Sequence, residues 1–172
     1  MDFKDLAKER YSLRKFSDKS IEREKLELVL RAGQFAPTAT NAQPQRILVI
    51  DDKDILNSLK ECTPYLFDAP TVLIVFYDRN VASVRKYDDK SYGEVDATIV
   101  ITHIMLQATD LGLGTTFVGH FNPKLLVEKL NIPENIIPVG ILPIGYPAKE
   151  AEPSLKHNER YPIEQIVFYN KF

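Results

Sequence analysis

Arg10-Tyr11-Ser12-Leu13-Arg14 places two guanidinium groups and a hydroxyl within five residues, next to the N-terminus. Arginine presents a rigid fork of donors that matches a phosphate, and serine adds a neutral donor. Backbone N–H groups of a tight segment add further donors. The stretch therefore predicts a phosphate-binding segment. The alternative is a solvated pair of charges at a helix end, and these five residues alone leave both interpretations open.

Helical patterns lie on both sides of this stretch. Asp2 is a favourable N-cap for a short helix that reaches about Glu9, with Phe3 and Leu6 as its buried face. Residues 21–35 follow the apolar spacing of an amphipathic helix, with charged residues on the opposite face.

The next stretch, 36–44, contains two prolines and several small polar residues, which exclude a regular helix. Its small side chains allow a flat ligand to approach the backbone. Asn41 and Gln43 carry amides that both donate and accept hydrogen bonds, and the edge of a flavin ring displays the same mixed pattern. A plain connecting loop is the open alternative.

Strands and helices alternate through the rest of the chain. We expect strands at 46–50 (buried), 71–77, 115–118 and 139–145, a short helix after a turn within 51–60, and a helix over 123–130 with Asn122 as N-cap. The polar residues 78–93 indicate a loop or a mobile helix. The tail, 153–172, ends in apolar residues that predict docking on another surface. This order favours an α+β fold with a central sheet flanked by helices.

A long helix is expected over 94–111, because the stretch holds neither glycine nor proline and is too long for one strand. Ile99, Thr102, Leu106 and Thr109 keep a helical stripe, and the stripe is widened by Ile101, Ile104 and Met105, so we expect this helix to be buried on most sides. Gly112 falls where a C-terminal cap is expected.

Composition limits the classes of function. The 172 residues are 44% apolar and 27% charged, which predicts one globular domain spanning 1–172. The net charge of −2, with both signs interspersed, argues against a nucleic-acid partner. The single cysteine, Cys62, excludes an internal disulfide framework and fits a reducing compartment. Because no apolar run resembles a leader or a membrane span, we expect a cytoplasmic protein with no membrane partner.

Two other kinds of site are disfavoured. The glycines in Gly112-Leu113-Gly114 follow a helix and precede a strand, whereas a dinucleotide-binding loop has the opposite order. The three histidines lack metal-ligand spacing, so no metal site is predicted.

Three stretches together resemble the nitroreductase family of FMN-dependent oxidoreductases. The first is the 10–14 segment followed by Phe16, and the second is the 36–44 loop. The third is the long helix that ends in Leu111-Gly112-Leu113-Gly114-Thr115, with Gly145-Tyr146-Pro147 further on. Their order and spacing are similar to the family across nearly the whole chain.

The resemblance implies an α+β sandwich with a mixed or antiparallel sheet and a homodimer with FMN sites at its interface. It also implies that the C-terminal tail is exchanged with the partner subunit. The implied FMN-binding residues are Arg10, Tyr11, Ser12 and Arg14 for the phosphate and ribityl end, Pro37, Thr38, Ala39, Asn41 and Gln43 from the other subunit, Pro143, Ile144 and Gly145 along the ring near N5, and Arg160 at the phosphate.

The implied activity is hydride transfer from NADH or NADPH to flavin N5, followed by reduction of a small organic acceptor: a nitroaromatic, a quinone or a flavin. Such an exchange predicts ping-pong kinetics. The cofactor carries the chemistry, so no catalytic side chain is predicted, and Arg14 is the candidate cation near N1 and O2. Reductive dehalogenation, flavin fragmentation and non-enzymatic FMN binding remain open alternatives.

Three positions depart from the family pattern. Tyr11 stands where a basic residue is common, Thr38 where serine is commoner, and Gln45 where an aromatic residue often follows Gln-Pro. These departures leave the expectation of FMN binding in place and bear on the shape of the substrate pocket.

Overall fold

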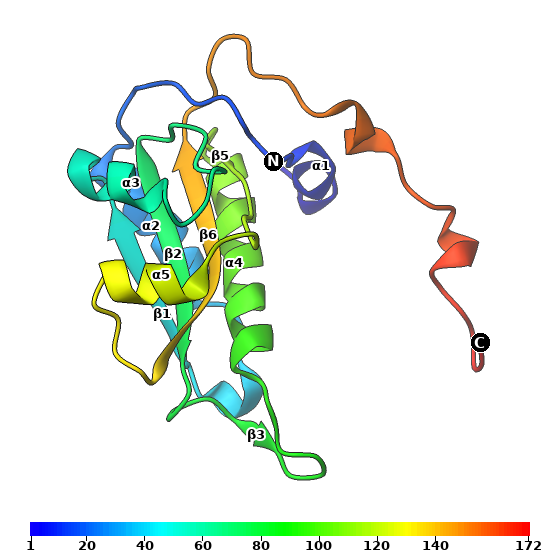
Figure 1. Ribbon diagram of the computed structural model, residues 1–172. Helices are drawn as coiled ribbons and strands as arrows, with labels where there is room; N and C mark the ends of the chain where they lie inside the picture. The colour runs from blue at the N-terminus through cyan, green and yellow to red at the C-terminus, as the bar shows by residue number, and fades with distance from the viewer.

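The computed structural model describes residues 1–172 and is built around one antiparallel sheet (Figure 1). The strand order is β1-β2-β6-β5. The strands are β1 (Gln45–Ile50), β2 (Thr71–Asp78), β6 (Ile136–Gly145) and β5 (Gly114–Thr115). A separate two-stranded hairpin is formed by β3 (Val84–Arg85) and β4 (Lys90–Ser91).

Helices cover both faces of the sheet. The α-helices are α1 (Phe3–Glu9), α2 (Arg23–Gln34), α3 (Lys53–Leu59), α4 (Gly93–Asp110) and α5 (Pro123–Lys129). Three short 3-10 turns are η1 (Ala39–Asn41), η2 (Leu155–Asn158) and η3 (Ile163–Gln165). The α+β class predicted from the sequence is confirmed. Of the two sheet types expected, mixed or antiparallel, the structure has the antiparallel one.

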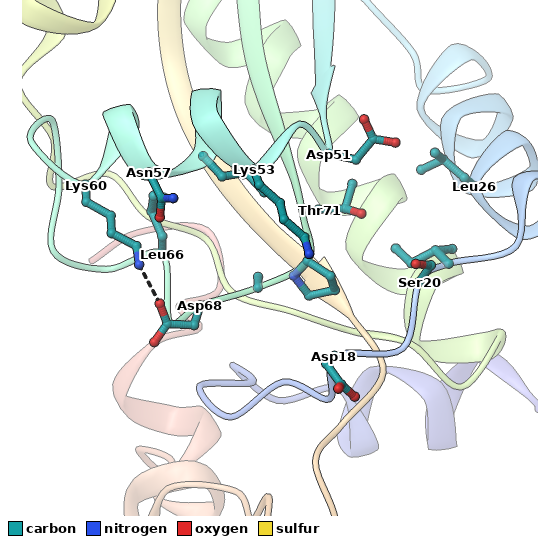
Figure 2. Close-up of a pocket in the computed structure, with 14 residues that line it drawn as sticks. Asp18, Ser20, Leu26, Asp51, Lys53, Asn57, Lys60, Leu66, Asp68 and Thr71 are labelled. Atoms are coloured by element: carbon teal, nitrogen blue, oxygen red, sulfur yellow. Dashed lines mark hydrogen bonds and ion pairs between the residues drawn. The ribbon is translucent and has the colours of Figure 1, made fainter.

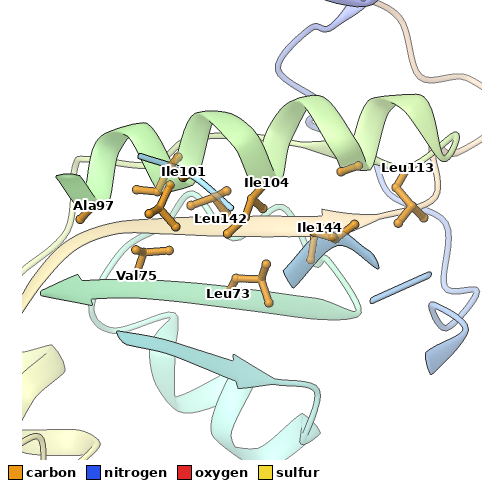
Figure 3. Close-up of a cluster of buried hydrophobic side chains, with 12 residues drawn as sticks. Leu73, Val75, Ala97, Ile101, Ile104, Leu113, Leu142 and Ile144 are labelled. Carbon is orange, nitrogen blue, oxygen red and sulfur yellow. The ribbon is translucent and has the colours of Figure 1, made fainter. Parts of the chain in front are cut away.

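The central strand β2 separates two apolar layers. Side chains alternate across a strand, so Leu73 and Val75 face α2 and α4, whereas Val72, Ile74 and Phe76 face α3 and α5. Figure 3 shows the first layer, where α4 packs along β6 and β2. A strand buried on both faces reads as a continuous apolar run, which is why 71–77 was recognisable in the sequence.

Local signals define several helix ends, and those at Asp2, Asn122 and Gly112 were expected from the sequence. The side chains of Asp2, Asp52 and Asn122 accept hydrogen bonds from the first turns of α1, α3 and α5. Gly112 has a φ of 75°, and the N–H of Leu113 donates to the carbonyl of Ala108, which closes the C-terminus of α4.

The structure corrects two expectations about strands. The strand predicted as buried over 46–50 is β1, an edge strand in which only Ile50 is buried. The strand predicted over 115–118 is shorter, because only Gly114–Thr115 pair regularly, with an isolated bridge from Val118 to Ile141.

Tertiary contacts refine two other expectations. Residues 78–93 are mostly turns and connections, as in the loop alternative, but they also contain the short β3–β4 hairpin, and no helix begins among them before α4 at Gly93. The buried residues of α4 include Ile101 and Ile104 of the widened stripe, with Ala97, Val100 and Ala108, whereas Thr102 of the stripe is exposed. Both sides of α4 are apolar, so the sequence could not show which side faces the sheet.

Apolar side chains at both ends of the chain are exposed. No residue of α1 is buried, and Phe3, expected in its buried face, is 70% exposed. The apolar end of the tail runs away from the sheet and its helices (Figure 1), and Phe168 and Phe172 are exposed. The expected docking of the tail therefore does not occur within one copy, and its exchange with a partner subunit stays a prediction. None of the helices combines the length and the apolar character that crossing a bilayer requires.

A cluster of charges ties α2 to the end of β6. The Tyr146 hydroxyl donates to Glu22 at 2.5 Å, and Lys25 donates to the Tyr146 oxygen at 2.9 Å. Lys19 bonds the other carboxylate oxygen of Glu22 at 2.9 Å. The hydrogen bond from Tyr146, and then that from Lys19, lower the pKa of Glu22 from 4.5 to about 2.

A group whose pKa is lowered by folding stabilises the folded state above its unfolded value and loses that contribution as the pH falls. The wild-type protein should therefore lose stability from Glu22 between pH 4.5 and about 2. Glu22→Gln should be less stable at neutral pH and less sensitive to acid in this window. Urea unfolding at neutral and acidic pH measures the difference, and the exposed Glu24→Gln should keep the wild-type slope.

Candidate functional site

The Arg10–Arg14 segment is docked against the sheet beside β5. Ser12 pairs with Thr115 in a parallel bridge, and the Leu13 N–H donates to the Thr115 carbonyl at 2.9 Å. The Leu13 side chain is fully buried against Gly114, where an added Cβ would lie 2.4 Å from Leu13 Cδ2. Because side chains alternate along an extended segment, burying Leu13 leaves Arg14 exposed. The segment is a positioned element and not a charge pair at a helix end.

Arg14 lies between two adjacent hollows of about 330 and 720 Å³. The smaller one is walled by Tyr65 and Phe67 on one side and by residues 116–120 on the other. These two walls are joined, because Thr63 Oγ1 donates to the His120 carbonyl at 2.7 Å. The arrangement places one cation, flat aromatic surfaces and an irregular backbone segment around these hollows.

The residues of these walls were missed by the sequence reasoning. Residues 115–118 were assigned to a strand, and 61–70 were given no role. No motif marks either stretch, and only the fold brings them to Arg14. The aromatic pair Tyr65 and Phe67, set two residues apart before a buried strand, is the one signal that was available.

The C-terminal tail approaches the N-terminal segment. The Tyr11 and His157 rings meet edge to face with centroids 6.2 Å apart, and burial raises the pKa of the Tyr11 phenol. Arg160 donates to the carbonyls of His157 and Glu159, each at 2.6 Å. The fold thus connects the two basic segments through His157, and the Arg160 guanidinium remains exposed. Arg10 is half-buried where α1 ends.

The 36–44 loop lies at the other end of the sheet, next to the β3–β4 hairpin (Figure 1). Pro37, Asn41 and Gln43 are exposed, whereas Thr38 and Ala39 are half-buried. The loop leads directly into β1, whose first residue, Gln45, pairs with Tyr77. The opposite end of β2, at Thr71, pairs with Ile144, and the next residue of β6, Gly145, pairs with Gly114 of β5.

The two predicted groups of site residues are therefore separated by the length of β2. From Thr71 to Tyr77 this strand spans about 20 Å, at about 3.3 Å per residue. A rigid strand cannot bring its two ends together. Within one copy, the Arg10–Arg14 segment and the 37–43 loop do not form one site.

Pro143, Ile144 and Gly145 are the third predicted group, and all three are buried. Gly145 pairs with β5, and Pro143 and Ile144 pair with β2, so the strand is covered on both edges. None of the three lines a hollow that Arg14 lines. Residues 116–120 are the segment that faces Arg14 instead.

A third cavity, of about 490 Å³, lies between the start of α2 and α3 and contains none of the predicted site residues (Figure 2). Its lining carries Asp18, Asp51 and Asp68 together with Lys53 and Lys60. Lys60 and Asp68 pair at 2.8 Å, as the dashed line shows. Charges of both signs give this cavity no preference for an anion such as a phosphate.

Three buried side-chain oxygens have no hydrogen-bond partner: Gln45 Oε1, Asp96 Oδ2 and Thr115 Oγ1. Buried polar groups are nearly always paired, so such atoms call for an explanation. Thr115 is the bridge partner of Ser12, Gln45 directly follows the 36–44 loop, and Asp96 bonds to Ala39 of that loop. All three therefore adjoin one or other of the two groups of predicted site residues.

Taken together, the sheet between two helical layers and the arginine-bearing segment docked on its edge define an α+β domain with a hollow at its periphery that is lined by an arginine and by aromatic side chains. Comparison with known proteins identifies the family. The model of the Nitroreductase family matches residues 7–63 and 57–146, and the chain belongs to this family. The prediction made from the sequence is confirmed.

Individual relatives agree with this assignment. A nitroreductase family protein of Clostridium difficile 630 has 40% identity and a TM-score of 0.94, with each chain covered completely. An FMN-dependent nitroreductase of Clostridium difficile R20291 has 28% identity and a TM-score of 0.80, covering 97% of this chain and 98% of that one. The FMN reductase [NAD(P)H] of Bacillus subtilis is 28% identical over 87% of this chain and 70% of its own length.

Leu13 tests how the arginine-bearing segment is held. Leu13→Ala removes a fully buried side chain and should destabilise the protein by about 2–5 kcal/mol, the usual range for such truncations. It should also loosen Arg14, because the two residues share one short segment. Chemical unfolding measures the first effect. Leu155→Ala, at a side chain that is 98% exposed, is the control and should leave stability nearly unchanged.

Proposed function

We propose that the protein is an FMN-dependent NAD(P)H oxidoreductase that works as a homodimer, each FMN site being built from both copies. Its acceptor is a small organic molecule of the nitroaromatic, quinone or flavin class. Residues 1–172 form a single nitroreductase-like domain. One observation carries the proposal. The predicted FMN-binding residues of the 10–14 segment and those of the 37–43 loop are separated by the length of β2, so one copy cannot bring them together.

The side chains present fit FMN. Arg10 and Ser12 are donors of the kind that bind a phosphomonoester, and the backbone of their segment is immobilised by β5. Aromatic walls and the exposed amides of Asn41 and Gln43 suit a flat ring with alternating donors and acceptors. The relatives named as an FMN-dependent nitroreductase and as an FMN reductase that uses NAD(P)H support the same cofactor and donor.

Exposed apolar surface supports the dimer. Phe3 of α1, Leu28 and Phe35 around α2, Val95 of α4 and the aromatic residues of the tail are all exposed in one copy. Covering such side chains with a second copy would remove apolar area from water, which favours association. Phe35 directly precedes the 36–44 loop, so a partner that covers it also reaches one half of the site.

The residues have distinct tasks in this scheme. When bound, FMN supplies hydride transfer at N5, which makes a side-chain acid or base unnecessary. Arg14 places a fixed positive charge at the hollow and favours the reduced, anionic form of the cofactor. Residues 116–120 and the aromatic wall limit the space for donor and acceptor. Because the donor and the acceptor would occupy the same site in turn, ping-pong kinetics are expected.

Arg14→Ala tests this assignment on the purified protein. The wild type should be yellow with an FMN spectrum, and anaerobic NADH or NADPH should bleach it. The variant should bind FMN about tenfold or more weakly and lower its midpoint potential, because a charge-assisted contact of about 1.5–3 kcal/mol is lost. Fluorescence titration and potentiometry measure the two effects. Arg23→Ala, on the exposed face of α2, is the matched control.

Unchanged affinity and potential in Arg14→Ala would remove this residue from the site. A yellow protein that neither nicotinamide bleaches would instead indicate a passive FMN-binding protein, and a colourless protein that takes up no FMN would overturn the proposed function.

Mixed dimers test whether each site uses both copies. One subunit carries Arg14→Ala and the other carries Asn41→Ala with Gln43→Ala, so each homodimer has two defective sites. If a site combines the arginine segment of one copy with the loop of its partner, the mixed dimer regains one intact site and binds one FMN tightly. If both groups came from the same copy, every site of the mixed dimer would remain defective. Equilibrium dialysis of affinity-tagged mixed dimers distinguishes these outcomes.

A further inference from the structure

The loop at the far end of the sheet has an unusual backbone. Thr40, Asn41 and Gln43 have φ values of 53°, 54° and 50°, in the left-handed region that residues other than glycine rarely adopt. Each such residue costs free energy and persists only where its surroundings impose it. Bonds within the loop, such as that from the Gln43 N–H to Thr38 Oγ1 at 3.1 Å, hold part of this shape, and contacts from outside the loop hold the rest.

The first outside contact comes from α4. Asp96 Oδ1 accepts a hydrogen bond from the Ala39 N–H at 2.9 Å. The Asp96 side chain lies in the first turn of the helix and is only 2% exposed, and its second oxygen is buried without a partner. A carboxylate buried in this way is unfavourable for folding by itself, which indicates that its contact with the loop has another use.

The second outside contact comes from the segment between β2 and β3. Ser83 Oγ donates to the Ala39 carbonyl at 3.0 Å and lies 2.5 Å from Thr40 Oγ1. A serine hydroxyl has one hydrogen, so Thr40 is the donor in the second contact. Ala39 is thus held at its N–H by Asp96 and at its carbonyl by Ser83, immediately before the first left-handed residue.

We propose that Asp96 and Ser83 are positioning residues for FMN. They hold the 38–43 loop, before any ligand arrives, in the shape that presents the Asn41 and Gln43 amides. This inference rests on the proposed function. A loop that is already ordered loses little conformational entropy on binding, so the same contacts give tighter and slower-dissociating cofactor. The polar connection also gives a use to the 78–93 stretch, to which no role could be assigned from sequence.

The test uses the purified FMN-loaded dimer and follows release of FMN after dilution by the recovery of its fluorescence. Ser83→Ala removes both hydroxyl contacts, and Asp96→Asn replaces the charged acceptor with a neutral one. Ser83→Ala should release FMN about tenfold faster than the wild type, the change expected when supporting hydrogen bonds of this kind are lost. Asp96→Asn should also release FMN faster, by a smaller factor, because its amide oxygen still accepts from the Ala39 N–H but without the charge. Ser83→Thr keeps the hydroxyl and should restore slow release.

Controls separate positioning from general stability. Glu94→Gln changes an exposed carboxylate in the same turn of α4 and should release FMN at the wild-type rate. Thermal unfolding and the midpoint potential are recorded for every variant, because a merely structural contact would change the unfolding temperature alone. If Asp96→Asn does not fold, Ser83→Ala with its threonine rescue decides.

Wild-type release rates and potentials in both variants, from a wild-type protein that does hold FMN, would overturn this inference and leave the proposed function intact. The inference would also be overturned if lower thermal stability were accompanied by unchanged release. A wild-type protein that holds no FMN would refute the proposed function itself.

Discussion

The rigidity of β2 is the constraint on which the rest of the molecule depends. The strand is hydrogen-bonded on both edges, to β1 and to β6, and seven of its eight residues are buried. Neither bending nor sliding is open to it without breaking the apolar layers on both faces. Its length therefore keeps the arginine-bearing segment and the 36–44 loop about 20 Å apart. A ligand that needs both groups needs two copies of the chain.

The two ends of the sheet hold their ligand-binding segments by different means. At one end, Leu13 enters the core and Ser12 extends the pairing of β5, so ordinary strand alternation aims Arg14 outward. At the other end the loop cannot join the sheet, and side-chain hydrogen bonds from Asp96 and Ser83 hold it. Helix α4 begins beside the 36–44 loop and ends beside the Arg10–Arg14 segment. It spans about 27 Å, at about 1.5 Å per residue.

Features of the fold that depend on neighbouring residues could be predicted from the sequence. The caps at Asp2 and Asn122 and the left-handed Gly112 follow from local backbone chemistry, and the apolar run of β2 reflects burial on both of its faces. The buried face of α4 could not be predicted, because apolar residues surround the helix and only its neighbours distinguish its sides. Phe3 was placed in a core for a similar reason, since its pattern does not reveal whether the covering surface belongs to the same copy.

The same distinction applies to the site. Arg10, Ser12 and Arg14 lie within five residues, so the sequence could single them out as a candidate phosphate-binding segment, with a solvated pair of charges as the open alternative. The walls around Arg14 come from 63–67 and 116–120, which only the tertiary fold brings together. Pro143 to Gly145 carry a recognisable strand end, yet pairing on both edges covers them. A motif read along the chain does not show which backbone edge remains open.

In the proposed dimer, the exposed apolar side chains and the incomplete FMN site of a single copy have one common cause, which is the missing partner subunit. The phenylalanines of α1 and the tail remain in water in a single copy, and the oxygens beside both half-sites remain unpaired. Covering these phenylalanines with a partner subunit would lower the free energy in proportion to the apolar area removed from water. The same association brings the loop of one copy to the arginines of the other. A ligand bound between them stabilises only the assembled state, so cofactor affinity and subunit affinity are thermodynamically linked.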